Sequence, residues 1–586
     1  MSDVPLAGHD REAAALSAAT PRWSSSQAKP RSDVGTILLH WLVAIAMVAS
    51  LLTGLRISAD APNAIVSKAL SPILPQGEIW TVHFVAGLSL MFGLTAYVIY
   101  IARSGLAERN AARRIKAVTL PGSSPAARKA RWGAVNIALH WFMYGIVAVM
   151  TATGIALYLG FGGWIAAIHA ACALISLAYI FVHITTHFLY GGWNQILRLF
   201  KPSRLVGNAA QRRPLLAATL VSLPVIVGLA YADVASRSRL AIEPVATSPD
   251  LSLRLSDPAW KTARPVFVRT MQGSNFGGTG ETTIEIRALH DTENVYFAMR
   301  WWDPSRSLRR VPMIKRADGW HLLDTAADRA DVVDYYEDKL AVIFSDSDAF
   351  GSGGSTHMGP RPLADRPAPL NERGYHYTTD GSYIDMWQWK ASRGGMLGFV
   401  ENMHIGPPTE PTPAEIAVKG RYQAGYWGDP GGTMYRYNFS FEGPGGYRGV
   451  VTPLRLPKDW RATVAGLGAF DPNPDAGVAA GSKWWMFEAA DTVPYSAELD
   501  ATVPVGTVMP GVLITGEYTG GRGGISSSAD WADNHWTLVA KRRLKTGSKY
   551  DKDFTPGSRY YLWVSAFDHT QTRHTRHVRP VEVVFR

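Results

Sequence analysis

The stretch "HAACALISLAYIFVHITTH", residues 169–187, is an apolar segment that contains three histidines. Titratable side chains at membrane depth are costly, and they usually face the interior of a helix bundle where other groups satisfy them. His169 and His183 are fourteen residues apart, nearly four helical turns, so they share one helix face about 21 Å apart along the axis. That separation places one imidazole near each side of a hydrocarbon core about 30 Å thick. The segment therefore predicts a transmembrane helix with imidazoles at two depths.

The positive charge of the chain is confined to its first part. Residues 1–213 contain 19 Lys and Arg against 7 Asp and Glu, whereas the remainder contains 40 against 41. A basic chain is compatible with nucleic-acid binding. Here, however, the charge lies in loops between apolar segments, which the positive-inside rule of membrane proteins explains better. We therefore expect membrane lipid, and no nucleic acid, as a partner.

The single cysteine, Cys172, excludes several cofactor sites. A disulfide within the chain, a CxxCH haem attachment, a cysteine-ligated iron–sulfur cluster and a Cys-rich zinc site all need more cysteines. Any metal or cofactor must be held by His, Met, Lys or carboxylates. No hydrolytic arrangement of residues stands out, so a stand-alone catalyst is not predicted.

Five apolar segments are long enough to span a membrane. The polar leader, residues 1–34, is predicted to be disordered, and no cleavable signal peptide precedes the first span. The spans are expected at about 35–56, 79–102, 133–158, 164–190 and 215–232.

The loops between these segments predict the orientation. Residues 103–131 contain eight Lys and Arg and one acid, and residues 191–213 contain five and none, so both loops should be cytoplasmic. Everything after about residue 233 then lies outside, in the periplasm of a Gram-negative bacterium. The expected location is the bacterial inner membrane.

The rest of the chain has short β-type runs separated by Gly, Pro and Asp, several of them alternating apolar and polar residues. Examples are "TTIEIRALH", "NVYFAMRWW", "KLAVIFS", "RYYLWVSAFD" and "VEVVFR". They predict an antiparallel β-sandwich with long loops near 348–380 and 401–415. The expected division is a leader (1–34), a four-helix membrane domain (35–200), a fifth transmembrane helix (214–233) and a periplasmic β-sandwich (240–586).

An internal repeat links the first and third spans. "LLHWLVAIAMVASLLTG" at 38–54 recurs as "ALHWFMYGIVAVMTATG" at 138–154, and His83 matches His183 at the same offset of 100 residues. The first four spans therefore resemble a duplicated helix pair.

Heights in an up-and-down bundle follow from where each histidine lies in its span. His83 and His169 should lie near the outer side, and His40 and His183 near the inner side. Bis-imidazole ligation from facing helices is how a bundle holds haem b without cysteine. The alternative is that these histidines are packed and hydrogen-bonded to neighbouring carbonyls.

His140 and His187 have no defined role from sequence. Either residue could ligate a further haem, replace one of the four histidines above, or bond to a haem propionate or a quinone.

The "LHW…TG" first helix, His83 on the second helix and the His-x13-His fourth helix resemble the bacterial b561-type cytochromes b. This group includes the membrane subunits of nickel–iron hydrogenases and formate dehydrogenases. The resemblance covers about residues 33–200. It implies two haems b, ligated by His83 with His169 and by His40 with His183, and quinone chemistry near one of them. His140 departs from the pattern, because the third helix generally supplies no ligand.

The C-terminal part resembles the haem-binding γ subunit of ethylbenzene dehydrogenase and its relatives. The resemblance rests on "TTIEIRALHDTENVYFAMRWWDPSRS" at 282–307, "YYEDKLAVIFSD" at 335–346 and "YIDMWQWKA" at 383–391. It implies a β-sandwich that holds one haem b, with a Met before the tryptophan-rich strand and a Lys near the end as axial ligands.

This chain departs from that pattern at both ligand positions. "GSGGSTHMGP" offers His357 and Met358, and "HTQTRHTRHVRP" offers histidines where a Lys is expected. We expect His577 with either His357 or Met358 as the axial ligands, and only one of His574 and His577 to matter. The alternative is that these are surface-loop residues.

The resemblances together imply a membrane haem protein that transfers electrons between the quinone pool and a periplasmic haem domain or redox partner. It would be a component of a respiratory oxidoreductase. The competing hypothesis is a membrane anchor whose periplasmic β-sandwich binds a ligand or a partner for another dehydrogenase.

Overall fold

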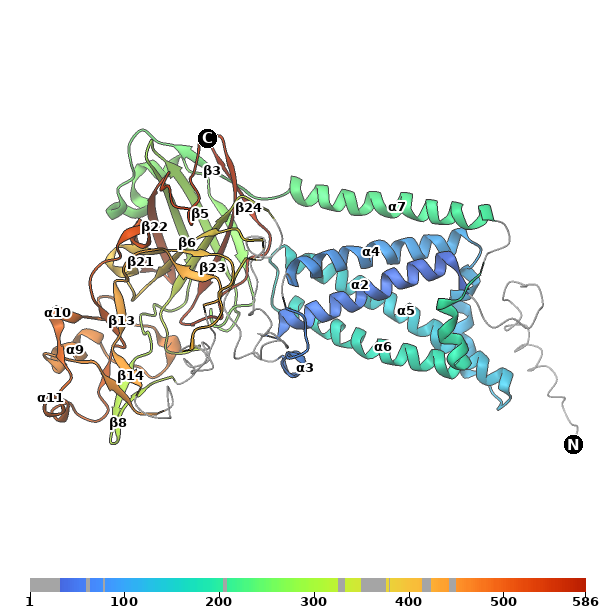
Figure 1. The fold of residues 1–586 in the computed structure, drawn as a ribbon, viewed down its shortest axis with the longest axis horizontal. Helices are drawn as coiled ribbons and strands as arrows, with labels where there is room; N and C mark the ends of the chain where they lie inside the picture. The colour runs from blue at the N-terminus through green and yellow to red at the C-terminus, as the bar shows by residue number, and fades with distance from the viewer. Residues whose placement is uncertain are drawn as a thin grey trace, which may run out of the picture. The chain divides into compact units, whose positions relative to one another are not determined.

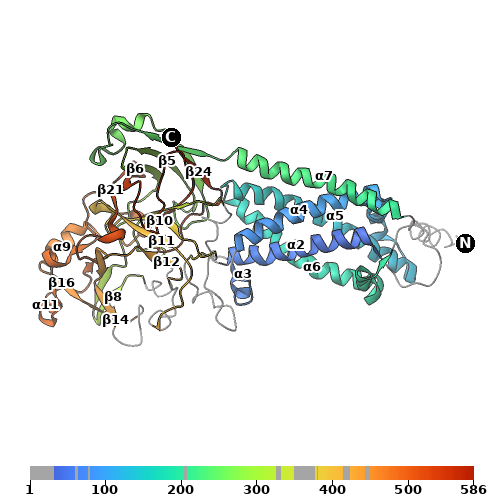
Figure 2. The same cartoon turned by 45° about the horizontal axis from the view of Figure 1, so that its top comes forward.

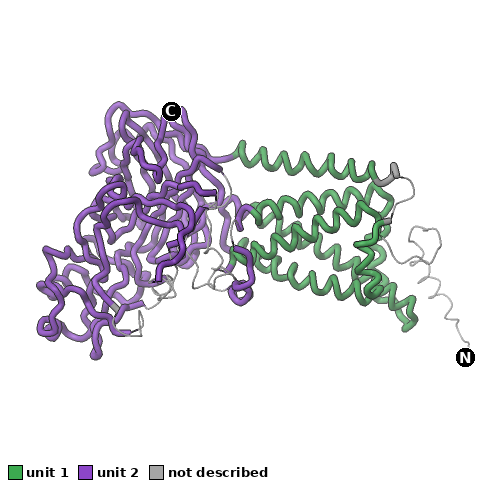
Figure 3. The backbone as a smooth tube through the Cα atoms, viewed as in Figure 1, with its two compact units in different colours: residues 1–58, 82–155, 164–236 green, residues 59–81, 156–163, 237–586 purple. Residues whose placement is uncertain are grey.

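The computed structural model describes residues 32–59, 64–76, 79–203, 208–324, 332–348, 376–378, 380–413, 423–441 and 449–586. The chain divides into two compact units, shown in Figure 3. Residues 1–58, 82–155 and 164–236 form the helical unit, and residues 59–81, 156–163 and 237–586 form the β unit. Each unit is described separately below.

Five long helices build the helical unit, and each is long and apolar enough to cross a membrane. Figures 1 and 2 both show α2, α4, α5 and α6 side by side, with α7 running along them. The five predicted spans are confirmed. The helices are α2 (Val34–Ser58), α4 (Ile79–Arg103), α5 (Pro125–Tyr158), α6 (Trp164–Leu197) and α7 (Asn208–Ala235).

Helices α5, α6 and α7 are each longer than the apolar segment that predicted them. Helix α5 begins at Pro125 rather than near residue 133, because Pro suits the first helical position and the Ser124 hydroxyl accepts the Ala127 N–H at 3.1 Å. Helix α6 breaks at Gly191 and Gly192, whose φ angles of −157° and 60° leave the helical region. Glycine adopts the positive φ at residue 192 without a Cβ penalty.

The β unit is built on a twelve-stranded sheet with the order β10-β9-β23-β24-β3-β5-β6-β22-β21-β11-β12, to which β4 is added beside β5. Its strands are β3 (Arg239–Pro244), β4 (Val266–Thr270), β5 (Thr282–His290), β6 (Asn294–Trp302), β9 (Lys339–Ser345), β10 (Ile384–Lys390), β11 (Phe399–Ile405), β12 (Tyr426–Gly428), β21 (Ile525–Ala532), β22 (His535–Arg543), β23 (Arg559–Phe567) and β24 (Val581–Phe585).

The sheet closes on itself, because β10 pairs with β11 as well as with β9. The predicted β-rich domain is therefore confirmed, and its two faces belong to one barrel-like sheet. Most pairings are antiparallel, but β3 pairs in parallel with β24 and with β5. Closure leaves β10 and β11 without free edges and encloses a core rich in tryptophan, including Trp301, Trp387, Trp389 and Trp536.

The predicted strands agree with the structure, whereas the loop predicted near 348–380 lies largely outside the described residues. The runs "TTIEIRALH", "NVYFAMRWW" and "KLAVIFS" coincide with β5, β6 and β9. The loop predicted at 401–415 is wrong at its start, since Phe399–Ile405 form β11. Its polar residues misled the prediction, because Glu401, Asn402 and His404 are buried and hydrogen-bonded to Lys390, Asp429 and Asp551.

Smaller sheets and short helices complete the β unit (Figures 1 and 2). A five-stranded sheet contains β14 (Phe439–Phe441), β15 (Val451–Pro453), β8 (Gly319–Leu322), β7 (Met313–Arg316) and β19 (Val508–Met509). A three-stranded sheet contains β13 (Tyr435–Tyr437), β20 (Val512–Ile514) and β17 (Met486–Phe487), and β16 (Arg455–Pro457) pairs with β18 (Thr492–Pro494). The helices are α3 (Ile65–Leu70), α9 (Trp460–Leu467), α10 (Glu488–Asp491) and α11 (Ala497–Ala501).

Glu337 connects the segment before β9 to the turn after β10. Its side chain is fully buried, and its carboxylate accepts the Ser392 N–H and hydroxyl, each at 2.7 Å, and a hydrogen bond from Arg393 Nε. Burial alone would raise the pKa of Glu337, but Arg393 and then Arg310 hold this pKa at about 2. A carboxylate whose pKa is lower in the folded state than in the unfolded chain stabilises the fold above the unfolded pKa.

We expect Glu337→Gln to lower the free energy of unfolding by about 3 kcal/mol at pH 7, the value of the pKa shift. The difference from the unsubstituted protein should shrink as the pH falls from about 4.5 towards 2, because the carboxylate then becomes protonated. Urea unfolding of the full chain, followed by tryptophan fluorescence, measures it. Glu498→Gln, at an exposed position, is the control. If it lowered the free energy of unfolding as much as Glu337→Gln does at every pH, the stabilising role of the Glu337 carboxylate would be contradicted.

Candidate functional site

Two pairs of histidines meet inside the helical unit. His83 of α4 and His169 of α6 have ring centres 6.5 Å apart, and His40 of α2 and His183 of α6 have ring centres 6.4 Å apart. Two imidazoles on opposite sides of one iron, each with a metal–nitrogen bond of about 2 Å, place their ring centres roughly 6 Å apart. Both predicted pairs therefore have the spacing that a shared iron requires.

The Thr-Gly pairs of the internal repeat lie against the first of these histidine pairs. Thr53 Oγ1 lies 3.0 Å from His83 Nδ1, and Thr153 Oγ1 lies 2.9 Å from His169 Nδ1. Each hydroxyl already donates its proton to a carbonyl of its own helix, Ala49 at 2.6 Å and Val149 at 2.8 Å. Each threonine must therefore accept the imidazole Nδ1–H.

This hydrogen bond determines which tautomer the histidines adopt. With the proton on Nδ1, the Nε2 lone pair is free to bind a metal. A hydrogen bond from the other ring nitrogen is also what orients a ligating histidine and raises its basicity. The repeat therefore holds His83 and His169 in the form that a haem iron needs.

The glycine of each pair provides room for the imidazole. A Cβ atom on Gly54 would lie 3.2 Å from His83 Cε1, and one on Gly154 would lie 3.4 Å from His169 Cε1. The first distance is tighter than ordinary carbon–carbon contact. Glycine at these positions lets the helix backbone approach the ring closely.

Two further histidines, His140 and His187, lie beside the second pair, so that four imidazoles form one cluster. Ligand atoms of His140, His183 and His187 all lie within 4.8 Å of one another. His140 and His187 have ring centres 6.1 Å apart, but His183 and His187 are separated by only 4.6 Å. Two parallel porphyrins do not fit at that separation, so these four imidazoles cannot hold two separate haems.

Hydrogen bonds distinguish the members of this cluster. His140 Nδ1 lies 2.5 Å from the Asn136 carbonyl, which can only accept, so His140 also carries its proton on Nδ1. His183 Nδ1 lies 3.1 Å from the Tyr179 hydroxyl, whose ring stacks on His183. A metal-binding tautomer is thus available at His140 too.

The predicted ligands of the β unit are not brought together among the described residues. His357 and Met358 lie outside those residues. His577 is buried, and its Nδ1 accepts the backbone N–H of Val564 at 3.2 Å, so the proton resides on Nε2. Burial lowers the pKa of His577 to about 4. As placed, His577 is a packed residue that must turn before it can bind iron.

His376, which was not predicted as a ligand, lies beside His574. His376, which precedes β10, and His574, which follows β23, have ring centres 6.2 Å apart. His574 Nδ1 lies 2.7 Å from the Thr575 carbonyl. The signal for His376 is its position just before the tryptophan-rich strand, where the γ-subunit resemblance places an axial ligand.

A third cluster consists of carboxylates at strand ends. Asp303, Asp338 and Asp568 are fully buried, with ligand oxygens within 4.8 Å of one another. They accept backbone N–H groups of Ser305, Ser307, His569 and Phe276. These bonds join the ends of β6, β9 and β23, so the cluster has a structural explanation.

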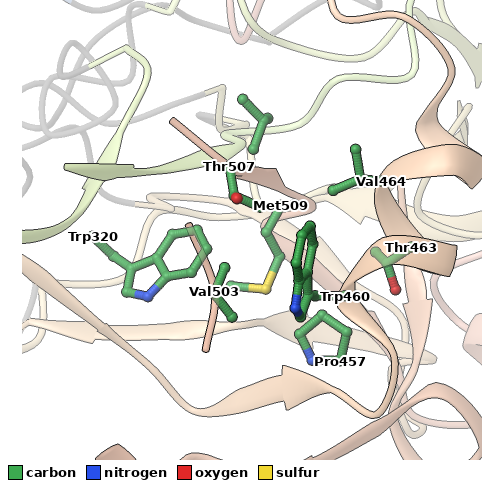
Figure 4. A pocket seen from close by; sticks show the side chains of 9 residues that line it. Trp320, Pro457, Trp460, Thr463, Val464, Val503, Thr507 and Met509 are labelled. Carbon is green, nitrogen blue, oxygen red and sulfur yellow. The ribbon is translucent and has the colours of Figure 1, made fainter. Parts of the chain in front are cut away.

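A small pocket lies between α9 and the five-stranded sheet (Figure 4). None of its lining residues is titratable. It offers no group for proton transfer or for strong metal ligation. Its lining includes Trp320, Pro457, Trp460, Val503 and Met509.

Family comparisons agree with these two units. The family model described as ethylbenzene dehydrogenase matches residues 257–579, more than half of the chain. The chain belongs to the ethylbenzene dehydrogenase family. The family model described as prokaryotic cytochrome b561 matches residues 31–202, which include all six histidines of the helical unit. The predicted fusion of these two families is confirmed.

Other comparisons are less informative. No curated protein matches the chain significantly. A carbohydrate binding module family 9 from Caldicellulosiruptor kristjanssonii in complex with glucose is 7% identical, with a TM-score of 0.22, covering 60% of this chain and 96% of that chain. A putative carbohydrate-binding protein from Bacteroides uniformis ATCC 8492 is 8% identical, with a TM-score of 0.21, covering 60% and 100%. Likeness at this level carries no argument about fold or ligand.

The family matches and the five apolar helices establish the general chemistry. This member of the ethylbenzene dehydrogenase family is a multi-pass membrane protein with a cytochrome b domain, and its membrane part uses haem b for electron transfer. The β unit contains the match to the ethylbenzene dehydrogenase family, which fits a redox domain working with the cytochrome b domain.

We expect Thr153→Val to weaken haem retention at the His83–His169 pair by about tenfold, because valine keeps the shape of threonine but cannot accept the Nδ1–H of His169. The midpoint potential of that haem should rise, since a less basic imidazole stabilises the oxidised iron less. A redox titration of the purified full chain, followed by haem absorbance, measures both effects.

Thr151→Val is the matched control, because Thr151 Oγ1 makes the same type of bond to the Val147 carbonyl at 2.8 Å. Equal changes in the two variants would show that the hydrogen bond to His169 has no influence on the haem.

Proposed function

We propose that the protein transfers electrons between the membrane quinone pool and a haem in the β unit, which exchanges them with a periplasmic redox partner. The observation that supports this most strongly is the presence of two imidazole pairs at iron-sharing distance, separated along α6 by fourteen residues. Two haems at different depths provide a path across the hydrocarbon core.

In this proposal His83 and His169 hold one haem b, and His40 and His183 hold the other. Each haem, when bound, takes up and releases one electron. The protein's own contribution is to fix the ligands and the potential, through axial imidazoles, their hydrogen bonds and burial. Thr53 and Thr153 orient the first pair, and Tyr179 contacts His183 of the second.

His140 and His187 are assigned to the quinone. One haem uses only two of the four imidazoles in the second cluster, so these two remain beside it. Oxidation of a quinol releases protons together with electrons, and neutral imidazoles at this position accept protons. His140, whose Nδ1–H is fixed to the Asn136 carbonyl, presents Nε2 as the acceptor.

The arrangement in the membrane follows from the charges of the loops. We place the basic loops 103–131 and 191–213 in the cytoplasm and the β unit in the periplasm of a bacterial inner membrane. The proposed functional division is the four-helix domain at 35–200, the fifth helix at 214–233 and the haem-binding domain at 240–586.

We expect the purified full chain to contain about three b-type haems, two in the helical unit and one in the β unit, with none covalently bound. A pyridine haemochrome assay, before and after acid–acetone extraction, gives both numbers. A stably folded chain without haem, or with haem that resists extraction, would contradict the proposal.

His83→Ala and His169→Ala should each remove the same haem, because an iron with one imidazole loses affinity and its low-spin signal. His40→Ala and His183→Ala should remove the other. His140→Ala should retain both haems and slow reduction by quinol. Loss of a haem in His140→Ala together with its retention in His40→Ala would show that the second pair is assigned wrongly.

A further inference from the structure

We infer that His376 and His574 are the axial ligands of the haem in the β unit. This inference rests on the proposed function, in which the β unit contains a haem. It differs from the sequence-based assignment to His577 with His357 or Met358, because the structure places a different pair of imidazoles next to each other, with ring centres 6.2 Å apart.

The spacing of the two rings supports the pair. Their centres are 6.2 Å apart with an interplanar angle of 52°. The histidine pairs of the helical unit, at 6.4 and 6.5 Å, have nearly the same separation. One iron between two imidazoles requires about this distance, with a metal–nitrogen bond of about 2 Å on each side.

The protonation state of His574 fits a ligand. Because the Thr575 carbonyl accepts from Nδ1–H at 2.7 Å, Nε2 carries the lone pair. His577 has the opposite tautomer, since its Nδ1 accepts from Val564 N–H.

The local fold explains why His574 and not His577 faces His376. The chain after β23 turns back along that strand, where the Thr575 N–H donates to the Ala566 carbonyl at 2.9 Å and the Thr575 hydroxyl accepts from the Ala566 N–H at 3.0 Å. This pairing directs His577 towards Val564. His574 remains at the turn, with its ring 4.9 Å from that of Phe567.

The test compares His376→Ala, His574→Ala and His577→Ala in the full chain. Haem content by pyridine haemochrome and low-spin ferric EPR signals are the two measurements. We expect His376→Ala and His574→Ala each to lose the same haem, which is about one third of the haem in the chain. His577→Ala is the matched control, three residues away in the same segment, and should keep all three.

Chemical rescue separates a lost ligand from a misfolded domain. In His574→Gly, added imidazole should restore the lost haem and its low-spin signal, because free imidazole occupies the position of the side chain. Three haems in the His376→Ala/His574→Ala double variant would overturn the inference, and so would failure of imidazole to restore the signal. If the unsubstituted chain contained only the two haems of the helical unit, the proposed function would itself fail in the β unit.

Discussion

The hydrogen bond between a threonine hydroxyl of one helix and an imidazole Nδ1 of the next is the interaction on which the membrane site depends. Thr53 and Thr153 each donate to their own helix and accept from His83 and His169, at 3.0 and 2.9 Å. The bond fixes the tautomer, leaves Nε2 free to bind a metal and connects two helices. The adjacent glycines, Gly54 and Gly154, allow the close approach.

Much of this site could be predicted from sequence because its signals are periodic. The fourteen-residue spacing on α6 and the offset of 100 residues between two "LHW…TG" segments each report a helix face. Five of the six membrane histidines were identified in this way, and His187 was identified only as a histidine within the apolar segment. The role of Thr and Gly was not, since a hydroxyl in a transmembrane helix ordinarily bonds to its own backbone. Only the facing imidazole reveals their second partner.

The β unit was predicted less completely because its contacts join residues far apart in the chain. Strands β5, β6 and β9 follow from local alternation, whereas the closure of the sheet through β10 and β11 depends on tertiary pairing. For the same reason His376 was missed: nothing near it in sequence indicates that His574, almost 200 residues later, lies 6.2 Å away. A buried charge such as Glu337 is equally invisible until Arg393 is placed beside it.

The central claim is that electrons reach the β unit through the membrane haems. Stopped-flow reduction of the purified full chain by a water-soluble quinol, with each haem resolved spectrally, tests it most directly. All haems should be reduced in the unsubstituted protein, whereas in His83→Ala the haem of the β unit should stay oxidised while the His40–His183 haem is reduced. Reduction of the β-unit haem in His83→Ala at the unsubstituted rate would contradict the account.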